Sequence, residues 1–369
     1  MENSNTFLHI FKQLISKNDI NLICERHQYI DKARKFSVFN LINFFSLASL
    51  NQWKSFRHSC NLQDRFHYST VSKKAKDVPF AIAKDLFQLI LSRMNRSMIR
   101  KSKLPKTLLA IDSTTITLGE NRLPWARFHG KRSGIKLHVA IENSTTMPVN
   151  VEESVALTHD SLMLQDLIDP TCIIVADRGY FQITRSDKFK ETKQDFVIRM
   201  KSNIQIAYAR PLKRAVSETV EASNIVGDYS CLVGTTQNRS KLRHRIVEFI
   251  DYEGKTIRVI TNLYNLSSET IAQIYKDRWA IETFFKWLKQ NLNLSTIFGT
   301  SKNSVYTQLY TALLTHVILN GVYRILNKRI SYKKLSLLEF ARKLSADKLD
   351  FEWHYFLDDS INFILSNYG

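Results

Sequence analysis

Four polar residues recur at regular spacing in a stretch that has the pattern of a helix. They are Tyr275, Arg278, Glu282 and Lys289, so the offsets from the tyrosine are 3, 7 and 14 residues. At roughly 100° per residue, their side chains would lie within about 60° of one another on a single helix. An acid flanked by two cations suits a carboxylate that holds a metal ion while its neighbours hold phosphate oxygens. The spacing therefore predicts a charged row directed at phosphate chemistry.

The same stretch carries an apolar face beside the charged row. Six residues at helical spacing form this face: Ile274, Ile281, Phe284, Phe285, Leu288 and Leu292. An apolar stripe of this kind packs a helix against a core. We therefore expect one helix across 268–293, with its polar row along the edge of the packing.

Two further carboxylates each follow an apolar run that is typical of a buried strand. Asp112 follows residues 108–111, and Asp177 follows residues 173–176. Burying a carboxylate is costly unless it is paired, solvated or bound to a metal. Either aspartate alone is explained as well by a turn or helix cap. Together with Glu282 they provide three hard oxygen donors, which suit Mg²⁺ or Mn²⁺. Two such ions about 4 Å apart serve phosphoryl transfer.

The elements that must position these residues form an α/β pattern. Residues 6 to about 100 have helical apolar spacing, and helices return across 268–293 and 304–326. Between them we expect strands, by alternation or by short apolar runs. The expected strands are 107–118, 134–142, 148–157, 171–176, 196–200, 204–208, 229–233, 245–250 and 256–262. Three consecutive hairpin-linked strands, a short helix across 159–168 and another strand form an α/β pattern.

Three sequence blocks resemble those of DDE transposases of the bacterial insertion-sequence "IS-four" type. They are Ile111–Thr114, Val175–Phe181, and the spacing Tyr, two residues, Arg, three residues, Glu, six residues, Lys from Tyr275 to Lys289. The resemblance implies an RNase H-like catalytic core interrupted by a β-rich insertion and preceded by a helical N-terminal DNA-binding domain. It also implies that Asp112, Asp177 and Glu282 are the catalytic metal ligands.

This resemblance implies a DNA transposase that binds the terminal inverted repeats of its insertion sequence and catalyses metal-dependent strand cleavage and transfer. Mg²⁺ or Mn²⁺, as two ions, is the implied cofactor. Arg278 and Lys289 are expected to contact DNA phosphates, and Tyr275 to help hold the transposon end. The implied partners are double-stranded DNA, at the transposon ends and at the target, and a second subunit in a DNA-bound dimer. Two alternatives stay open: another RNase H-like nuclease, and a transposase-derived DNA-binding protein without catalysis.

With the resemblance, the expected domain organisation has five segments. They are a basic helical DNA-binding domain (1–104), a first core part with Asp112 and Asp177 (105–190), a β-rich insertion (191–265), a second core part with the Glu282 helix (266–330) and a helical tail (331–369).

Basic residues are concentrated near the N-terminus. The net charge is +19, and the first 106 residues hold 19 Lys and Arg against 7 Asp and Glu. Such asymmetry favours a polyanion, with nucleic acid ahead of a membrane. Two short helices, 52–60 and 70–77, the second capped by Ser69 or Thr70, could form a helix-turn-helix reader. Its DNA-binding lysines would be Lys73, Lys74 and Lys76. A basic bundle with a solvated lysine face is the alternative.

A second, weaker basic set follows the first catalytic strand. Lys136 and His138 alternate with apolar residues, so they share one strand face. That face could track a DNA backbone or simply face solvent. For His159 and Asp160 we expect a simpler role, as the cap of the next helix.

The remaining composition argues against several classes of protein. Four cysteines, at 24, 60, 172 and 231, are far apart and form no Cys-x-x-Cys pair, which opposes a zinc ribbon or a disulfide framework. No run of about 18 apolar residues predicts a membrane span, and no signal-peptide pattern opens the sequence. We therefore expect a cytoplasmic protein with no membrane partner, and the resemblance implies that it is bacterial and associated with the nucleoid.

Overall fold

The chain divides into two compact units in the computed structural model. The model describes residues 6–33, 35–63, 66–97, 106–212, 224–332 and 334–366. A helical unit comprises Met1–Arg100, Ile116–Gly134 and Phe285–Gly369. A sheet unit comprises Lys101–Thr115 and Ile135–Phe284. The segment 266–330 is divided between the two units, and the five expected domains stay a prediction.

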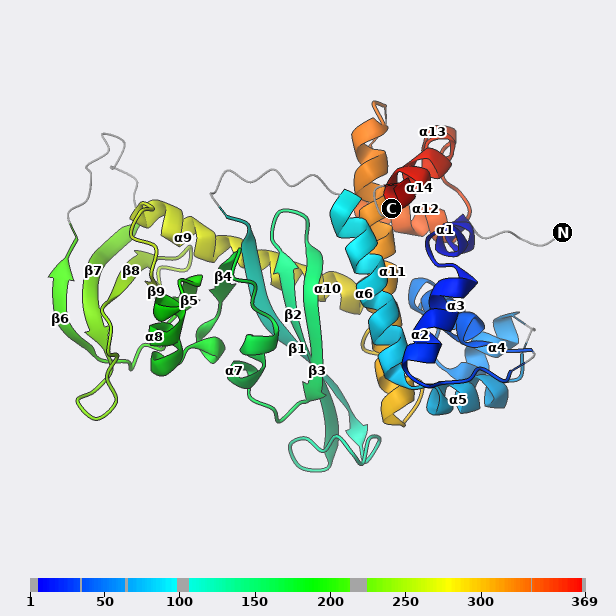
Figure 1. Cartoon of the computed structure of the whole chain (residues 1–369), viewed down its shortest axis with the longest axis horizontal. Coiled ribbons are helices and arrows are strands. Elements are labelled where there is room, and N and C mark those ends of the chain that lie inside the picture. Colours follow the sequence, from blue (N-terminus) through cyan, green and yellow to red (C-terminus); the bar gives the residue numbers. More distant parts are fainter. Residues whose placement is uncertain are drawn as a thin grey trace. The chain divides into compact units, whose positions relative to one another are not determined.

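A nine-stranded sheet dominates the sheet unit, in the order β3-β2-β1-β4-β5-β9-β8-β7-β6 (Figure 1). The far ends of β1 and β2 belong to the helical unit. The strands are β1 (Leu108–Glu120), β2 (Arg132–Glu142), β3 (Met147–Val155), β4 (Ile173–Ala176), β5 (Asp195–Arg199), β6 (Ile206–Pro211), β7 (Ile225–Val233), β8 (His244–Ile250) and β9 (Thr256–Thr261). Each lies within a few residues of an expected strand.

Strand directions divide the sheet into two parts. β4 pairs in parallel with both β1 and β5, and β2 pairs antiparallel with β3. This arrangement agrees with the RNase H-like core that the resemblance implies. β9 pairs antiparallel with β5, and β8, β7 and β6 continue antiparallel from it. The segment 191–265 is therefore β-rich, as expected, but it extends the core sheet and includes the core strand β5.

Helices cover both faces of the sheet because its strands alternate their buried side chains. Leu108, Ile173 and Val197 pack with the apolar side of α9 (Ser268–Asp277). Their neighbours in sequence pack on the other face with η1 (Leu164–Asp166) and with Phe189 of α8 (Ile183–Glu191). With both faces covered, the central strands are apolar throughout, which is the pattern their sequence shows.

The expected single helix across 268–293 is two helices. α9 ends at Asp277, and α10 (Trp279–Asn291) begins after Arg278. Around this break the backbone hydrogen bonds span three residues: Arg278 N–H donates to Tyr275 O at 3.2 Å, and Ile281 N–H to Arg278 O at 3.1 Å. Such tight turns rotate the helix face, so the four polar residues do not form one ideal row. All six residues of the expected apolar face are buried.

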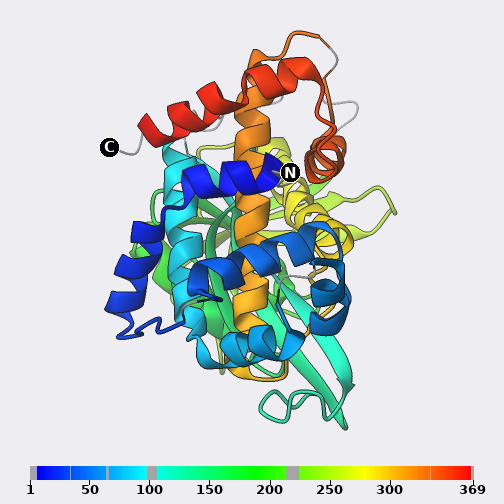
Figure 2. The same cartoon turned by 90° about the vertical axis from the view of Figure 1, so that its right-hand side faces the viewer.

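The helical unit is built around α11 (Lys302–Arg329), which packs against α3, α5 and α6. Figure 2 shows α11 in orange with α6 in cyan and α3 in blue. α11 is long and apolar enough to cross a membrane, but 89% of its apolar window is buried inside the protein. Gly321 allows α6 to approach closely, because a Cβ there would lie 2.5 Å from Met94 Sδ.

The remaining helices of this unit precede and follow α11. Before it come α1 (Thr6–Leu14), α2 (Lys17–Arg26), α3 (Val38–Leu50), α4 (Phe56–Gln63), α5 (Tyr68–Asp77) and α6 (Phe80–Ser97), and after it α12 (Leu337–Ser345), α13 (Phe351–Tyr355) and α14 (Leu357–Ser366). The described residues before β1 form helices, while a separate N-terminal DNA-binding domain stays a prediction. The cap of α5 is His67, whose side chain accepts from Ser69 N–H, and not Ser69 or Thr70.

Candidate active site

Two carboxylates meet at one edge of the parallel part of the sheet. In the register of β1 and β4, Ile111 is opposite Ala176, and Asp112 and Asp177 are the next residues on their strands. Because neighbouring strands lie about 4.8 Å apart, the two aspartates are adjacent. Glu282 lies in the first turn of α10. All three residues belong to the sheet unit.

Arg278 joins two of these carboxylates. Its Nη2 donates to Glu282 Oε1 at 2.7 Å, and its Nη1 lies 3.6 Å from Asp112 Oδ2. The arginine is only 9% exposed, so its charge is compensated by carboxylates and not by water. In this structure the guanidinium contacts acids, whereas the sequence predicted contacts to DNA phosphates.

The third carboxylate has two other partners. Tyr275 Oη donates to Asp177 Oδ1 at 3.1 Å, and Arg199 Nη1 lies 3.7 Å from the same oxygen. Tyr275 is buried, so it positions Asp177 and does not present its ring to solvent. Arg199 was missed from the sequence. Its signal was there, since it ends the apolar run 196–198 just as Asp177 ends the run on β4.

The surroundings favour proton uptake by Asp112. Burial raises the pKa of Asp112 to about 6, with Asp177 and Glu282 adding to the rise while the Ser113 N–H and Arg278 oppose it. Burial also raises the pKa of Tyr275, and the charge of Asp177 adds to this effect. Because these neighbouring carboxylates repel one another, binding of a cation among them is favourable.

The donor set fits a divalent ion, although it is not arranged for one. Among the described residues, no group of three His, Cys, Asp or Glu side chains has the spacing of a metal site. Instead, the Arg278 guanidinium lies against both Glu282 and Asp112. Three carboxylates are nevertheless the hard oxygen donors that Mg²⁺ and Mn²⁺ prefer.

A fourth carboxylate lies beside the first two, and the sequence-based interpretation of it was wrong. Asp160 is the first residue of α7 (Asp160–Met163), but His159 at the N-cap position makes no side-chain cap hydrogen bond. Instead, Asp160 Oδ1 accepts from Ser113 Oγ at 2.8 Å and from Lys136 Nζ at 3.0 Å. A Cβ at Gly179 would lie 3.7 Å from Asp160 Oδ2. Asp160 therefore lies between the segments that carry Asp112 and Asp177.

The structure corrects the expected DNA-tracking face of β2. Lys136 and His138 do share one face, but Lys136 also donates to Thr158 O at 2.9 Å and its side chain is only 12% exposed. His138 is fully buried, with Nε2 2.8 Å from Ser154 Oγ and Nδ1 3.6 Å from Asp160. Both side chains support Asp160 and do not face solvent.

The other expected DNA-binding residues belong to the helical unit. Lys73 and Lys76 are exposed on α5, and Lys289 is exposed on α10. Lys74, between the first two, forms an ion pair with Asp31, and its side chain is only 10% exposed. Lys74 thus differs from Lys73 and Lys76, although the sequence predicted the same DNA-binding role for all three.

Comparisons with known proteins agree with this geometry. Residues 103–318 match the family model described as "Transposase DDE domain". The chain is 44% identical, over 96% of its length and 94% of the relative's, to "Probable transposase for insertion sequence element IS5377" of Geobacillus stearothermophilus. It is 26% identical, over 77% of its length and 79% of the relative's, to a Synechocystis protein described as a transposase for insertion sequence element IS4SA.

One solved structure shares the fold. It is a cryo-EM structure of the piggyBac transposase synaptic complex with hairpin DNA, with a TM-score of 0.50 and 13% sequence identity. The match covers 98% of this chain and 86% of that chain.

Proposed function

Because this chain belongs to the DDE transposase family of bacterial insertion sequences, we propose that it cuts and joins DNA at the terminal inverted repeats of its own element. Its activity as a DNA transposase follows from the family, and enzymes of this family normally use divalent metal ions. Our proposal also names the catalytic residues, the metal ions that they bind and the DNA on which the protein acts. The observation that carries it is the meeting of Asp112, Asp177 and Glu282 beside Arg278 at one sheet edge.

We propose Asp112, Asp177 and Glu282 as the ligands of two Mg²⁺ or Mn²⁺ ions. When bound, such ions activate an attacking oxygen and stabilise the leaving oxygen of a phosphodiester. The raised pKa of Asp112, caused by burial and by the neighbouring acids, supports a cation at this place. Tyr275 and Arg199 hold the Asp177 carboxylate from its other side, so its orientation is fixed by side chains of this chain.

Arg278 and Lys289 have different roles in this proposal. Arg278 compensates the acids, and its planar fork of donors can also hold a phosphate oxygen. Lys289 is exposed and can contact the DNA backbone as a point charge. Asp160 contacts Lys136 and also Ser113, the residue next to Asp112 on β1, and so holds this part of the strand in place.

The partners follow from the reaction. Two transposon ends and a target must be joined, so we propose a dimer on double-stranded DNA. The cell's DNA is in the cytoplasm, and we place the protein there, associated with the nucleoid.

The proposal is tested on a duplex that carries the element's own end. Asp112→Asn and Asp177→Asn should each abolish Mg²⁺-dependent cutting while leaving binding within a few-fold, because phosphate contacts supply most of the affinity. Asp166→Asn is the matched control, since Asp166 is exposed in the same unit. If the wild type bound the end tightly and did not cut it, a non-catalytic DNA-binding protein would replace this proposal.

A further inference from the structure

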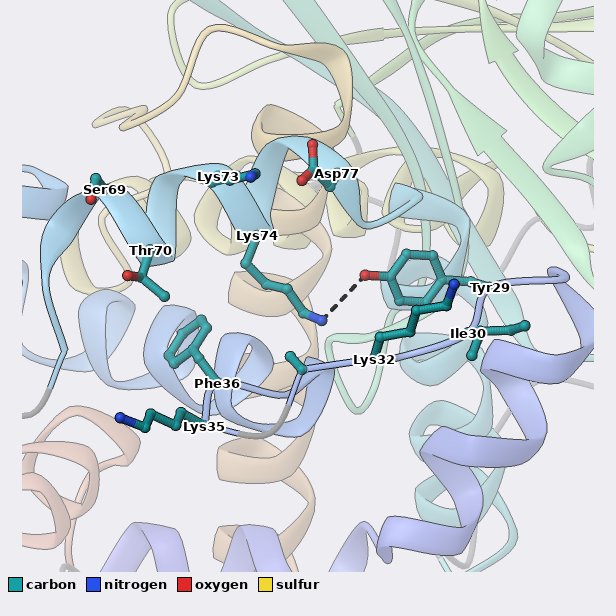
Figure 3. A pocket seen from close by; sticks show the side chains of 11 residues that line it. Tyr29, Ile30, Lys32, Lys35, Phe36, Ser69, Thr70, Lys73, Lys74 and Asp77 are labelled. Carbon is teal, nitrogen blue, oxygen red and sulfur yellow. Dashed lines mark hydrogen bonds between the residues drawn. The ribbon is translucent and has the colours of Figure 1, made fainter.

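A basic hollow lies in the helical unit, between a loop that supplies residues 29–33 and 35–36 and α5. Its volume is about 900 Å³. Figure 3 shows Lys32 and Lys35 on the loop side and Lys73 on the α5 side. Ser69 and Thr70 of the first turn of α5 also line it. Lysines thus reach the hollow from two separate segments of the chain.

Lys74 holds the loop against α5 and does not belong to the free lysines of the hollow. Its Nζ donates to Tyr29 Oη at 3.2 Å and forms an ion pair with Asp31. Asp31 in turn accepts from Val38 N–H at 2.6 Å. Burial opposes the charge of Asp31, but hydrogen bonds from Lys74 and two backbone N–H groups outweigh it and lower the pKa of Asp31. The charge of Lys74 is therefore neutralised by Asp31 within the protein.

Lys32, Lys35 and Lys73 are different, because they are exposed. None of the three forms an ion pair with another residue in the part of the chain that the structure describes. The lining includes one acid, Asp77. With the Lys74 pair neutral, positive charge dominates the lining, so the hollow attracts a polyanion.

We propose that this hollow binds the sugar–phosphate backbone of duplex DNA, with Lys32, Lys35 and Lys73 contacting phosphates and Lys74 as a structural support. This inference rests on the proposed function, because a transposase must hold DNA outside its catalytic carboxylates. Phe36 is buried and Lys74 Nζ lies 5.4 Å from the centre of the Tyr29 ring, so the exposed lysines are the groups that we expect to contact DNA. The contacts therefore position DNA without reading its sequence.

The test is the salt dependence of DNA binding by the full-length protein. Fluorescence anisotropy would follow two labelled duplexes of equal length, one with the element's end and one with that sequence shuffled. For each of Lys32→Ala, Lys35→Ala and Lys73→Ala, the slope of log Kobs against log salt should fall in magnitude by about 0.9, equally on both duplexes. Lys12→Ala is the matched control, since Lys12 is exposed on α1 of the same unit and should keep the wild-type slope.

Lys74→Met separates support from contact. We expect it to lower the melting temperature, while at a temperature where it is folded its salt slope stays closer to the wild type than that of Lys73→Ala.

Two results would overturn the inference: wild-type slopes for all three lysine variants, or affinity lost on the end duplex alone, which indicates base reading. If instead an acidic peptide were bound and DNA were not, the hollow would be a protein-binding site. A wild type that cuts its end while these variants keep the wild-type slope overturns this inference alone. A wild type that binds DNA without cutting overturns the proposed catalysis alone.

Discussion

The cations at the carboxylate site and the three exposed lysines of the basic hollow differ in whether an acid pairs with them. In the sheet unit, Arg278 and Lys136 are nearly buried. Arg278 forms ion pairs with Asp112 and Glu282, and Lys136 forms one with Asp160. In the helical unit, Lys32, Lys35 and Lys73 are exposed. The same residue types thus stabilise a carboxylate site in one unit and remain available to a polyanion in the other. The two groups of cations differ in whether a neighbouring carboxylate forms an ion pair with them.

The largest effect is expected from removing the cation that joins the carboxylates. Arg278→Met leaves Asp112 and Glu282 without their shared partner, and we expect end cutting to fall at least about 100-fold. Chemical denaturation should show a free energy of unfolding lower by about 3 kcal/mol, because breaking a buried pair leaves uncompensated charge. The assay is single-turnover cleavage of the end duplex.

Lys286→Met is the control for this change, because Lys286 is an exposed cation on α10. Cutting by Arg278→Met at the wild-type rate would remove the contrast between the two units, since Arg278 would then be no more essential than a surface lysine.

A smaller effect is expected at the carboxylate beside the site. Asp160→Asn weakens the contacts to Lys136 and Ser113, and residues that hold metal ligands in place typically contribute 10–100-fold in activity or metal affinity. We expect the Mg²⁺ concentration for half-maximal cutting to rise within that range, while the affinity for the end duplex stays unchanged. Lys136→Met should act in the same direction. If either variant lost DNA affinity instead, the β2 cations would contact DNA after all.

The smallest effect concerns stability and its dependence on pH. Burial lowers the pKa of His138 to about 4, against the opposing effect of Asp160. In the unfolded chain the same imidazole titrates near its ordinary value of about 6.5. Below that pH the unfolded state therefore binds a proton that the folded state does not. The free energy of unfolding should lose about 2 kcal/mol from this residue between pH 7.5 and pH 5, and nothing above 7.5.

The measurement is urea denaturation of the wild type and of His138→Gln across this pH range. The loss on acidification should be about 2 kcal/mol smaller in the variant. His244, whose pKa is also lowered by burial, is present in both proteins and cancels in the difference. Equal pH dependence in the two proteins would mean that His138 is solvated, as a DNA-tracking residue on a surface would be.

Local patterns were enough to predict the strands and the places of Asp112 and Asp177 beside each other; their catalytic role stays a prediction. An aspartate after an apolar run, as at Asp112 and Asp177, is costly at any buried position, so its presence is informative without knowledge of its neighbours. Parallel strands then bring such strand ends to one edge. The expected strands lie within a few residues of the observed ones for the same reason, since each is set by the spacing of apolar residues within one segment.

Local patterns could not predict which cations are exposed and which form ion pairs with acids. Lys73 and Lys74 are adjacent in sequence, yet one is exposed and the other is paired with Asp31. The partner of Lys74 lies 43 residues away, so no local pattern records the contact. The interpretation of Asp160 as a cap failed for the same reason, because Ser113 and Lys136 reach it from two other segments. The break between α9 and α10 at Arg278 was not predicted either, because the helical spacing of apolar residues continues through it.

The most direct test of this account is cleavage of a duplex carrying the element's own end, with Mg²⁺ or with EDTA, by the wild type and by Glu282→Gln. The account predicts cutting at the end by the wild type with Mg²⁺, none with EDTA, and none by Glu282→Gln, which still binds the duplex. Cutting by Glu282→Gln at the wild-type rate, or cutting that persists in EDTA, would contradict the assignment of the three carboxylates as the catalytic metal site.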